Sequence, residues 1–345
     1  MRPLAIPSEV ESALELGAAL AISISGGKDS QALLNALSAL HRERAWPGPV
    51  VALHADLGRA EWKQTPGHVR RIAAEAGVEL VVVRRAKGDL FTRFEERAAA
   101  VAGTATPWAP SSQRRYCTSH LKTAPLDAHL RRVEGAPRAP SASRRYCTSD
   151  LKRAPCDTAL RAHRLVVCAM GFRAQESTER AGRRVLSVRR RITSVPLQSL
   201  PVSGALEAWL RLGGERRLAL DWNPLHRWTR ADVWEACGTS EAELRLRRRA
   251  YAAGYHAEAL EGWPAHPAYV LGNERVSCAL CMLASRGDLL NGARHNPEAF
   301  EFIAGLEERT GSTFRPEGPL RRLVAALERP RPASAQLTVL DALAA

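Results

Sequence analysis

The segment SISGGKDS at residues 23–30 places two glycines, a lysine, an aspartate and hydroxyl side chains directly after an apolar run. Adjacent glycines let a backbone approach an anion closely, and the start of a helix adds N–H groups and a partial positive charge. Lys28 adds a mobile cation, whereas Asp29 fits beside phosphate only if a divalent metal is also bound. The four-residue spacer of a Walker A loop is missing. We therefore predict a phosphate-binding loop. The alternative is a plain strand-to-helix turn, which does not require Lys-Asp-Ser.

Seven cysteines are scattered through the chain, and the N-terminus has no signal-peptide core. Metal or catalytic roles are therefore expected ahead of a disulfide framework. Cys278 and Cys281 have the two-residue spacing that binds one metal or one cluster. Cys168 and Cys237 lie in apolar elements, and we expect both in the core.

Two further cysteines lie in a duplicated segment. Residues 109–132 align without gaps to residues 139–162, with 16 identical residues in 24 positions. Each copy contains Arg-Arg-Tyr-Cys-Thr-Ser, with Cys117 in the first and Cys147 in the second, and the arginines favour the thiolate. We expect Cys147 to be the working ligand, because its copy leads through a short helix into the next apolar run. With the Cys278–Cys281 pair it would form a three-thiolate site, whereas the addition of Cys117 would close a four-thiolate site.

The net charge is +14, and only five of the 50 basic residues are lysine. Such an excess of arginine is compatible with a solvated basic surface or with a footprint for a polyanion such as nucleic acid. Both interpretations stay open at the level of composition.

Strand and helix patterns alternate over the first half of the chain. Apolar runs at 19–25, 50–54, 79–85 and 164–171 are typical of strands, and helical spacing follows the first three. This alternation predicts a doubly wound, mostly parallel α/β sheet with helices on both faces. From about residue 205 helical patterns dominate. The expected units are an α/β domain at 1–204, a helical portion at 205–330 and a loose tail at 331–345.

No apolar run approaches the length of a membrane span. Together with the early acidic residues of the N-terminus, this leads us to expect a cytoplasmic protein without membrane contact.

The loop and six later segments together resemble a known family. SGGKDS is similar to the pyrophosphate loop of the ATP pyrophosphatases, the adenine nucleotide alpha-hydrolase superfamily. Within that superfamily, the ordered set resembles the phosphoadenosine phosphosulfate (PAPS) reductase family over roughly residues 18 to 325. The segments that carry the resemblance are LHADLG at 53–58, RRYCTSDLK at 144–152, GFRAQESTER at 171–180, NPLHRWTRADVW at 223–234, HPAY at 266–269 and CALC at 278–281.

The resemblance implies an adenine nucleotide alpha-hydrolase-like sheet that binds ATP, with Mg²⁺, at the first strand-to-helix turn. In the ATP-using branch the bond between the α and β phosphates is attacked, the substrate is adenylated and pyrophosphate leaves. The implied catalytic residues are Lys28, Asp29, Cys147 and Arg173. The implied nucleotide-binding residues are Ser25, Gly26, Gly27, Lys28, Asp29, Ser30, His54, Asp56, Gly171, Arg173 and Glu176. The implied ligands of a 4Fe–4S cluster, or alternatively of zinc, are Cys147, Cys278 and Cys281, with Cys117 as the additional candidate.

Two features depart from the sulfonucleotide reductases, which have a different first-strand loop and a catalytic cysteine near the C-terminus. This chain has the SGGKDS loop and no cysteine after Cys281. The resemblance therefore favours an ATP-dependent sulfurtransferase, as in DNA phosphorothioation and tRNA thiolation. Such an enzyme would act on nucleic acid or a nucleotide and take sulfur from a donor such as a cysteine desulfurase. A sulfonucleotide reductase and a non-catalytic nucleotide- or cluster-binding module are the alternatives.

Overall fold

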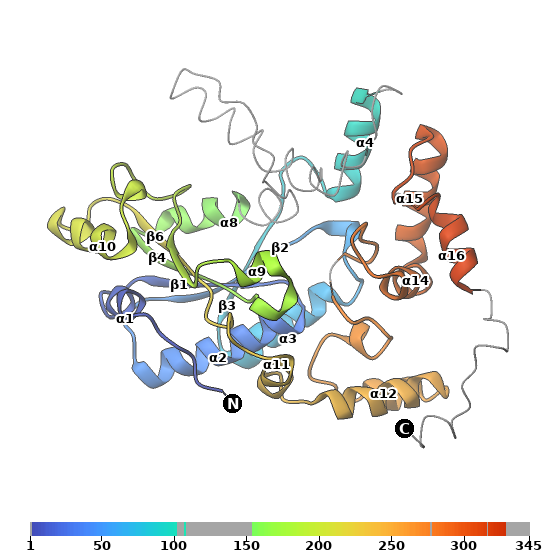
Figure 1. Cartoon of the computed structure of the whole chain (residues 1–345), viewed down its shortest axis with the longest axis horizontal. Helices are drawn as coiled ribbons and strands as arrows, with labels where there is room; N and C mark the ends of the chain where they lie inside the picture. The colour runs from blue at the N-terminus through green and yellow to red at the C-terminus, as the bar shows by residue number, and fades with distance from the viewer. Residues whose placement is uncertain (1, 102–106, 108–153, 277, 316, 329–345) are drawn as a thin grey trace.

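The computed structural model describes residues 2–101, 107, 154–276, 278–315 and 317–328 (Figure 1). Cys117, Cys147 and the tail at 331–345 lie outside these residues, as does most of the duplicated segment. The predictions that concern them stay predictions.

A six-stranded sheet forms the centre of the molecule, with the strand order β3-β2-β1-β4-β6-β5. All neighbouring strands are parallel except β5 and β6, which are antiparallel. The predicted doubly wound, mostly parallel α/β fold is therefore confirmed. The strands are β1 (Ala19–Ile24), β2 (Val50–Ala55), β3 (Glu79–Val83), β4 (Leu165–Met170), β5 (Leu186–Val188) and β6 (Leu218–Trp222).

Helices cover both faces of this sheet, so the central strands are buried on both sides. On one face, Leu20 and Ile22 of β1 pack into the largest core cluster with five helices. On the other face, Ala21 of β1 packs with Cys168 of β4 and Cys156 of α8 (Ala154–Ala159). The helices of the first face are α1 (Ser8–Glu15), α2 (Lys28–Arg44), α3 (Thr65–Ala76), α10 (Val202–Arg211) and α11 (Arg230–Ala236).

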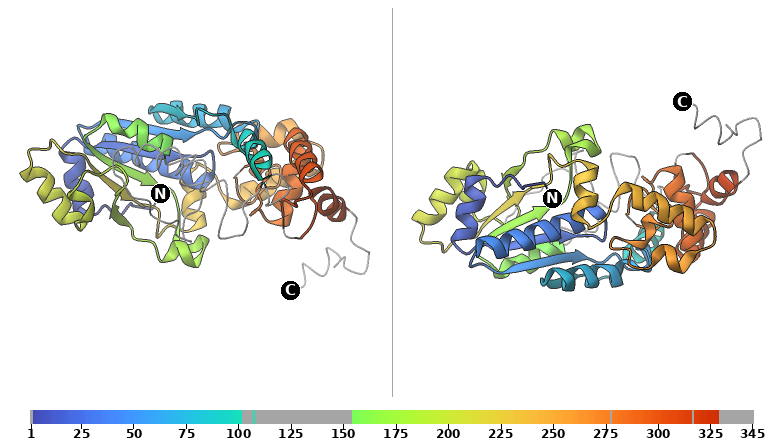
Figure 2. Two further views of the ribbon diagram at one scale, coloured as in Figure 1. Left: turned by 90° about the horizontal axis from the view of Figure 1, so that it is seen from above. Right: turned by 90° about the horizontal axis from the view of Figure 1, so that it is seen from below.

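A helical body lies at one end of the sheet (Figure 2). Its core includes Trp62, Phe91, Leu289 and Ile303, and it is separate from the two clusters on the sheet. The C-terminal helices of the chain are α12 (Glu241–Ala252), α13 (His256–Leu260), α14 (Arg286–His295), α15 (Pro297–Thr310) and α16 (Leu320–Glu328). The earlier helix α4 (Leu90–Val101) lies beside α15 in Figures 1 and 2, and Phe91 of α4 stacks on Phe302 of α15 with ring centroids 4.2 Å apart.

The structure contains two strands, β5 and β6, that the sequence analysis did not predict. β6 lies inside the segment expected to be helical, and it pairs with β4 and β5 in the sheet. The domain boundary expected at residue 204 therefore falls between two paired strands. A short run such as LALDW, buried at four of its five positions, lacks the alternation that distinguishes a strand from a buried helix.

Among the described helices, none combines the length and the apolar character needed to cross a membrane.

Candidate functional site

The two segments that follow β1 and β4 meet at the point where the strand order reverses. β1 continues through α2 to β2 on one side, while β4 pairs with β1 on the other side. In open α/β sheets, ligands bind in the crevice at such a switch point, outside the carboxyl ends of the strands. Residues 25–27 and 171–173 therefore lie where a ligand is expected.

The loop at 25–27 presents backbone donors and is fixed by its own serines. Gly26 has a left-handed φ of +76°, which favours glycine. The Ser30 hydroxyl accepts a hydrogen bond from the Ser25 N–H at 3.1 Å and donates to the Gly27 carbonyl at 2.8 Å. Within the described residues, no protein group accepts a hydrogen bond from the N–H of Gly26, Gly27 or Asp29. Three N–H donors at the start of α2, from Gly26, Gly27 and Asp29, are thus available to an anion.

Residues from the C-terminal half hold the first turn of α2 in place. The Lys28 N–H donates to the Tyr269 hydroxyl oxygen at 2.9 Å, and the Cys237 thiol donates to the Lys28 carbonyl at 3.3 Å. The Lys28 ammonium lies 5.7 Å from the ring centroid of Tyr269 and 5.9 Å from that of Trp234. The loop is therefore part of an interface between the sheet and later elements.

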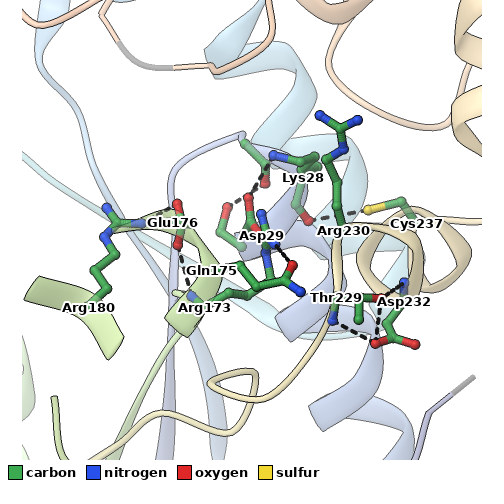
Figure 3. Close-up of polar contacts among 12 residues, drawn as sticks. Lys28, Asp29, Arg173, Gln175, Glu176, Arg180, Thr229, Arg230, Asp232 and Cys237 are labelled. Carbon is green, nitrogen blue, oxygen red and sulfur yellow. Dashed lines mark hydrogen bonds and ion pairs between the residues drawn. The ribbon is translucent and has the colours of Figure 1, made fainter. Parts of the chain in front are cut away.

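Lys28, Asp29 and Arg173 form a chain of opposite charges (Figure 3). One oxygen of Asp29 lies 3.0 Å from the Lys28 Nζ, and the other lies 2.5 Å from the Arg173 Nε. Burial disfavours the Asp29 carboxylate, but the charges of Lys28 and Arg173 outweigh this effect and hold the pKa of Asp29 below its ordinary value. Lys28 and Arg173 are only 6% and 5% exposed. One carboxylate thus lies between two buried cationic side chains.

The segment after β4 fits closely against the loop. A Cβ atom at Gly171 would lie 2.7 Å from the Asp29 carbonyl oxygen, so only glycine is accommodated. Arg173 precedes a short 3-10 turn at Ala174–Glu176, and the Glu176 carboxylate accepts a hydrogen bond from its N–H at 2.8 Å. Arg180 forms an ion pair with Glu176 as well. Glu176 thus acts on the site by positioning Arg173.

Two of the predicted nucleotide-binding residues, His54 and Asp56, contact neighbouring protein atoms. His54 is buried, with its Nδ1 3.4 Å from the Ile24 carbonyl and its Nε2 3.4 Å from a Glu61 oxygen. The Asp56 carboxylate accepts hydrogen bonds from the Gly58 N–H at 2.7 Å and from the Arg84 Nε at 2.6 Å. Both residues lie at the carboxyl end of β2, as expected, but these contacts fix the turn that follows the strand.

The structure also adds residues that sequence reasoning did not assign to the site. Tyr269 lies in the HPAY segment, where the motif alone indicated no role. Cys237 was expected in the core; it is buried, and burial raises the pKa of its thiol to about 12. Cys168 behaves in the same way, with a pKa of about 12. Neither thiol is therefore a candidate metal ligand.

Cys278 and Cys281 differ from these core cysteines because both are half-buried. Their loop is anchored to the turn after β2, since the Ala279 N–H donates to the Ala60 carbonyl at 2.8 Å. Gly292 of α14 also packs closely on this loop, and a Cβ there would lie 2.0 Å from the Ala279 carbonyl oxygen. No group of three or more His, Cys, Asp or Glu side chains suited to a metal ion occurs among the described residues, which exclude Cys117 and Cys147.

A mostly parallel sheet with a glycine-containing loop at its switch point is the arrangement found in α/β proteins that bind nucleotides. The profile of the phosphoadenosine phosphosulfate reductase domain family matches residues 19–252, and the chain belongs to this family. The predicted family is therefore confirmed. It is a family of nucleotide-dependent enzymes of sulfur chemistry within the adenine nucleotide alpha-hydrolase superfamily.

A curated relative matches a shorter part of the chain. The tRNA(Ile)-lysidine synthase of Anaplasma marginale (strain St. Maries) is 31% identical over 116 residues, which are 34% of this chain and 23% of that protein. The chain thus matches less than a quarter of the relative's length.

Two solved structures resemble the chain more distantly. The PAPS reductase of Candida auris, solved as a phosphate complex, is 14% identical, with 75% of this chain and 80% of that chain covered and a TM-score of 0.35. The U34-tRNA thiolase NcsA of Methanococcus maripaludis with its [4Fe-4S] cluster is 13% identical, with 92% and 73% covered and a TM-score of 0.33.

Proposed function

We propose that the protein cleaves ATP between the α and β phosphates and adenylates an acceptor that then receives sulfur. One observation carries this proposal: at the switch point, three backbone N–H groups with no acceptor among the described residues lie next to Lys28, and Asp29 links Lys28 to Arg173. Such a site is suited to charge that develops on a phosphate leaving group. Its donors are already in place, so little reorganisation is needed during the reaction.

The first step is a transfer of the adenylyl group. An acceptor oxygen attacks the α phosphorus, the bond from that phosphorus to the bridging oxygen of the β phosphate breaks, and pyrophosphate leaves with the bonding electron pair. The N–H groups of the loop and the Lys28 ammonium would bind the leaving group. Arg173, which lies after the neighbouring strand, would bind the same phosphates from the other side. Asp29 pairs with both cations and offsets one of their two positive charges before nucleotide binds.

The loop sequence had led us to expect a magnesium ion beside Asp29. The observed contacts of Asp29 do not fit such an ion. Both of its carboxylate oxygens contact cationic side chains. The described residues include no group of three acidic, histidine or cysteine side chains for a metal ion. We therefore derive no step of the reaction through a protein-bound magnesium ion.

The second step would replace the adenylyl group by sulfur, with release of AMP. Cys278 and Cys281 fit a cluster site because they are half-buried, share one anchored loop and supply two thiolates. Cys147 is the proposed third ligand and Cys117 the additional candidate. A 4Fe–4S cluster with one open iron would supply a binding position for sulfide. A donor such as a cysteine desulfurase would provide this sulfur as a persulfide, which a thiol reductant would reduce to sulfide. Zinc is the alternative metal.

The nucleotide step is tested by incubating the anaerobically purified protein with ATP and candidate acceptors, which are DNA, tRNA and nucleotides. We expect AMP and pyrophosphate. ADP and orthophosphate would contradict the proposal, binding without turnover would support a non-catalytic module, and sulfite release from a sulfonucleotide would support a reductase.

The cluster is tested by iron, zinc and sulfide analysis with a visible spectrum. We expect Cys278→Ser and Cys147→Ser to abolish cluster binding and Cys117→Ser to leave most of it. Cys168→Ser serves as the control, because this buried thiol lies in the core of the sheet. Equal loss from Cys117→Ser and Cys147→Ser would indicate four ligands.

A further inference from the structure

A cavity of about 340 Å³ lies between the turn that follows β2 and the helices α4 and α15. Its walls come from the segment 58–66, from the start of α4, and from Asn296 and the first two turns of α15. The volume is within the roughly 300–1,000 Å³ of pockets that bind small ligands. The residues that matter for its chemistry are Arg59, Glu61, Trp62, Phe91 and Phe302, and none of them belongs to the charged cluster around Asp29.

The guanidinium group of Arg59 is fixed over two aromatic rings at the wall of this cavity. Its Nε and Nη2 donate to the two oxygens of Asp89, at 2.7 and 2.9 Å. Its central carbon lies 5.6 Å from the ring centroid of Phe91 and 5.4 Å from that of Phe302, and the two rings are stacked with an angle of 5° between their planes. The Arg59 side chain is nevertheless 55% exposed. A guanidinium plane that is held in this way and still exposed is a surface on which a planar ring can stack.

The positive charges at this cavity are already paired, which distinguishes it from a phosphate site. Arg59 pairs with Asp89, and the exposed Lys63 pairs with the exposed Glu298 at 3.0 Å. The charges within each pair offset each other, and we assign no ligand contact to Lys63 or Glu298. The carboxylate of Glu61 also lines the cavity and supplies acceptors for N–H groups. The cavity therefore suits an uncharged planar ring with N–H donors better than it suits an anion.

The turn that forms one wall of the cavity contacts both parts of the proposed reaction site. A Glu61 oxygen lies 3.4 Å from Nε2 of His54, and Nδ1 of the same ring lies 3.4 Å from the carbonyl oxygen of Ile24, directly before the nucleotide loop. The Ala60 carbonyl accepts the hydrogen bond from the Ala279 N–H in the CALC segment at 2.8 Å. An acceptor that is first adenylated and then receives sulfur has to lie near both of these parts.

We infer that this cavity binds a nucleobase of a nucleic-acid acceptor, stacked on the Arg59 guanidinium and hydrogen-bonded to the Glu61 carboxylate. The inference rests on the proposed function, which leaves the acceptor open, and it commits the acceptor to a nucleic acid with an unstacked base. Bases taken out of a helix stack on guanidinium planes, and their amino and imino groups donate to carboxylates. The net charge of +14 favours a polynucleotide over a free base.

The test measures binding of a labelled single-stranded oligonucleotide to the full-length protein by fluorescence anisotropy, at fixed ionic strength. Arg59→Lys keeps the positive charge but removes the guanidinium plane, so binding should weaken about tenfold through the loss of one stacked base. Arg321→Lys is the matched control. Arg321 is also exposed, pairs with carboxylates and lies 5.6 Å from the ring centroid of Phe300, but it does not line the cavity. Circular dichroism melts check the folding of both variants.

Parallel titrations with an abasic oligonucleotide of the same length and with ATP identify the occupant. The wild type should prefer the oligonucleotide with bases to the abasic one, and Arg59→Lys should lose most of this preference while its ATP affinity stays unchanged. The inference is overturned if the wild type shows no preference, or if Arg59→Lys retains the preference in full. It is also overturned if Arg321→Lys loses the preference equally, or if Arg59→Lys weakens ATP binding alone, which would place the adenine of ATP in the cavity.

The same variant separates this inference from the proposed function. If ATP yields AMP and pyrophosphate but Arg59→Lys still prefers the oligonucleotide with bases, the inference fails while the function stands. If Arg59→Lys loses the preference for bases but the wild type does not cleave ATP, the base site is correct and the proposed function is wrong.

Discussion

At the scale of single residues, Lys28 is the cation on which the site depends most. Lys28→Ala removes a charge-stabilising donor, and we expect a loss of about 2–4 kcal/mol of transition-state stabilisation, roughly a hundredfold or more in rate. The rate of AMP formation measures this loss. Lys63→Ala is the control, because Lys63 is exposed and pairs with the exposed Glu298. Similar rates for wild type and Lys28→Ala would exclude the loop from the chemistry.

The close packing of Gly171 against the loop leads to a second prediction at this scale. In Gly171→Ala the new methyl group would meet the backbone of the nucleotide loop at 2.7 Å. We expect a destabilisation of about 1–3 kcal/mol, typical of overpacking, together with weaker ATP binding. Urea unfolding and nucleotide titration measure the two effects.

The control for that substitution is Gly182→Ala. Gly182 has a φ of −77°, and a Cβ there would have its nearest neighbour at 3.8 Å. Normal ATP affinity in Gly171→Ala would show that the loop tolerates displacement.

Some residues of the site can be predicted from the sequence next to them, whereas others depend on contacts between distant segments. The sequence predicted the SGGKDS loop, Gly171 and Arg173, because each follows a recognisable strand. Tyr269 could not be assigned, since its contact with Lys28 spans 241 residues and depends on how the helical body packs. His54 and Asp56 were correctly placed at the end of β2, but only the packed structure reveals their protein partners.

At the scale of elements, the strongly periodic segments were predicted closely. β1, β2, β3 and β4 begin and end within about two residues of the expected bounds. The missed strands β5 and β6 have three and five residues, too few for a period to be distinguished. The packing of α4 against α15 is a tertiary contact that the periodicity of neither helix predicts.

Two buried histidines, His68 and His266, lie next to Gly26 of the loop. The His266 Nδ1 accepts a hydrogen bond from the Ala268 N–H, so its proton is on Nε2, which lies 3.0 Å from the Thr65 hydroxyl. Burial lowers the pKa of His68 to about 3 and that of His266 to about 4, with a further contribution at His68 from its positively charged neighbours. A Cβ at Gly26 would lie 3.3 Å from Thr65 and 3.4 Å from His266.

These shifts predict how stability changes with pH. Both histidines are neutral in the folded state, while in the unfolded state they take up protons below about pH 6.5. Stability is therefore fully present above about pH 6.5 and falls as the pH decreases towards 4. At pH 5 the loss is about 2 kcal/mol for each histidine.

Urea unfolding at pH 7 and pH 5 checks this expectation. His68→Gln should lose less stability than wild type between the two values, whereas the exposed His256→Gln should lose as much. Equal free energies of unfolding at pH 7 and pH 5 in the wild type would contradict it.

At the scale of the whole molecule, carboxylates of the same chain neutralise only part of the positive charge of the arginines. Arg321 pairs with Glu301 and Glu308, and Arg315 pairs with Glu317. The net charge of +14 nevertheless leaves a strongly basic chain. This favours a polyanionic partner, as proposed for the acceptor.

We therefore expect the protein to bind single-stranded oligonucleotides with strong salt dependence, because bound arginines release condensed counterions. Contact with about six phosphates would cost roughly a thousandfold in affinity between 50 and 200 mM salt. Fluorescence anisotropy across a salt series measures the slope. A flat series would identify the arginines as a feature of composition alone.

The contacts of Lys28 with Cys237 and Tyr269 also bear on how the protein is made. A ribosome produces the loop early, but the tyrosine hydroxyl that fixes it follows 241 residues later. At about 5–20 residues per second, this interval lasts roughly 10–50 seconds. During it, the nascent sheet has the loop sequence without the partners that hold its first turn. Nucleotide can therefore assist only the last stage of folding, after the helical body has emerged and docked.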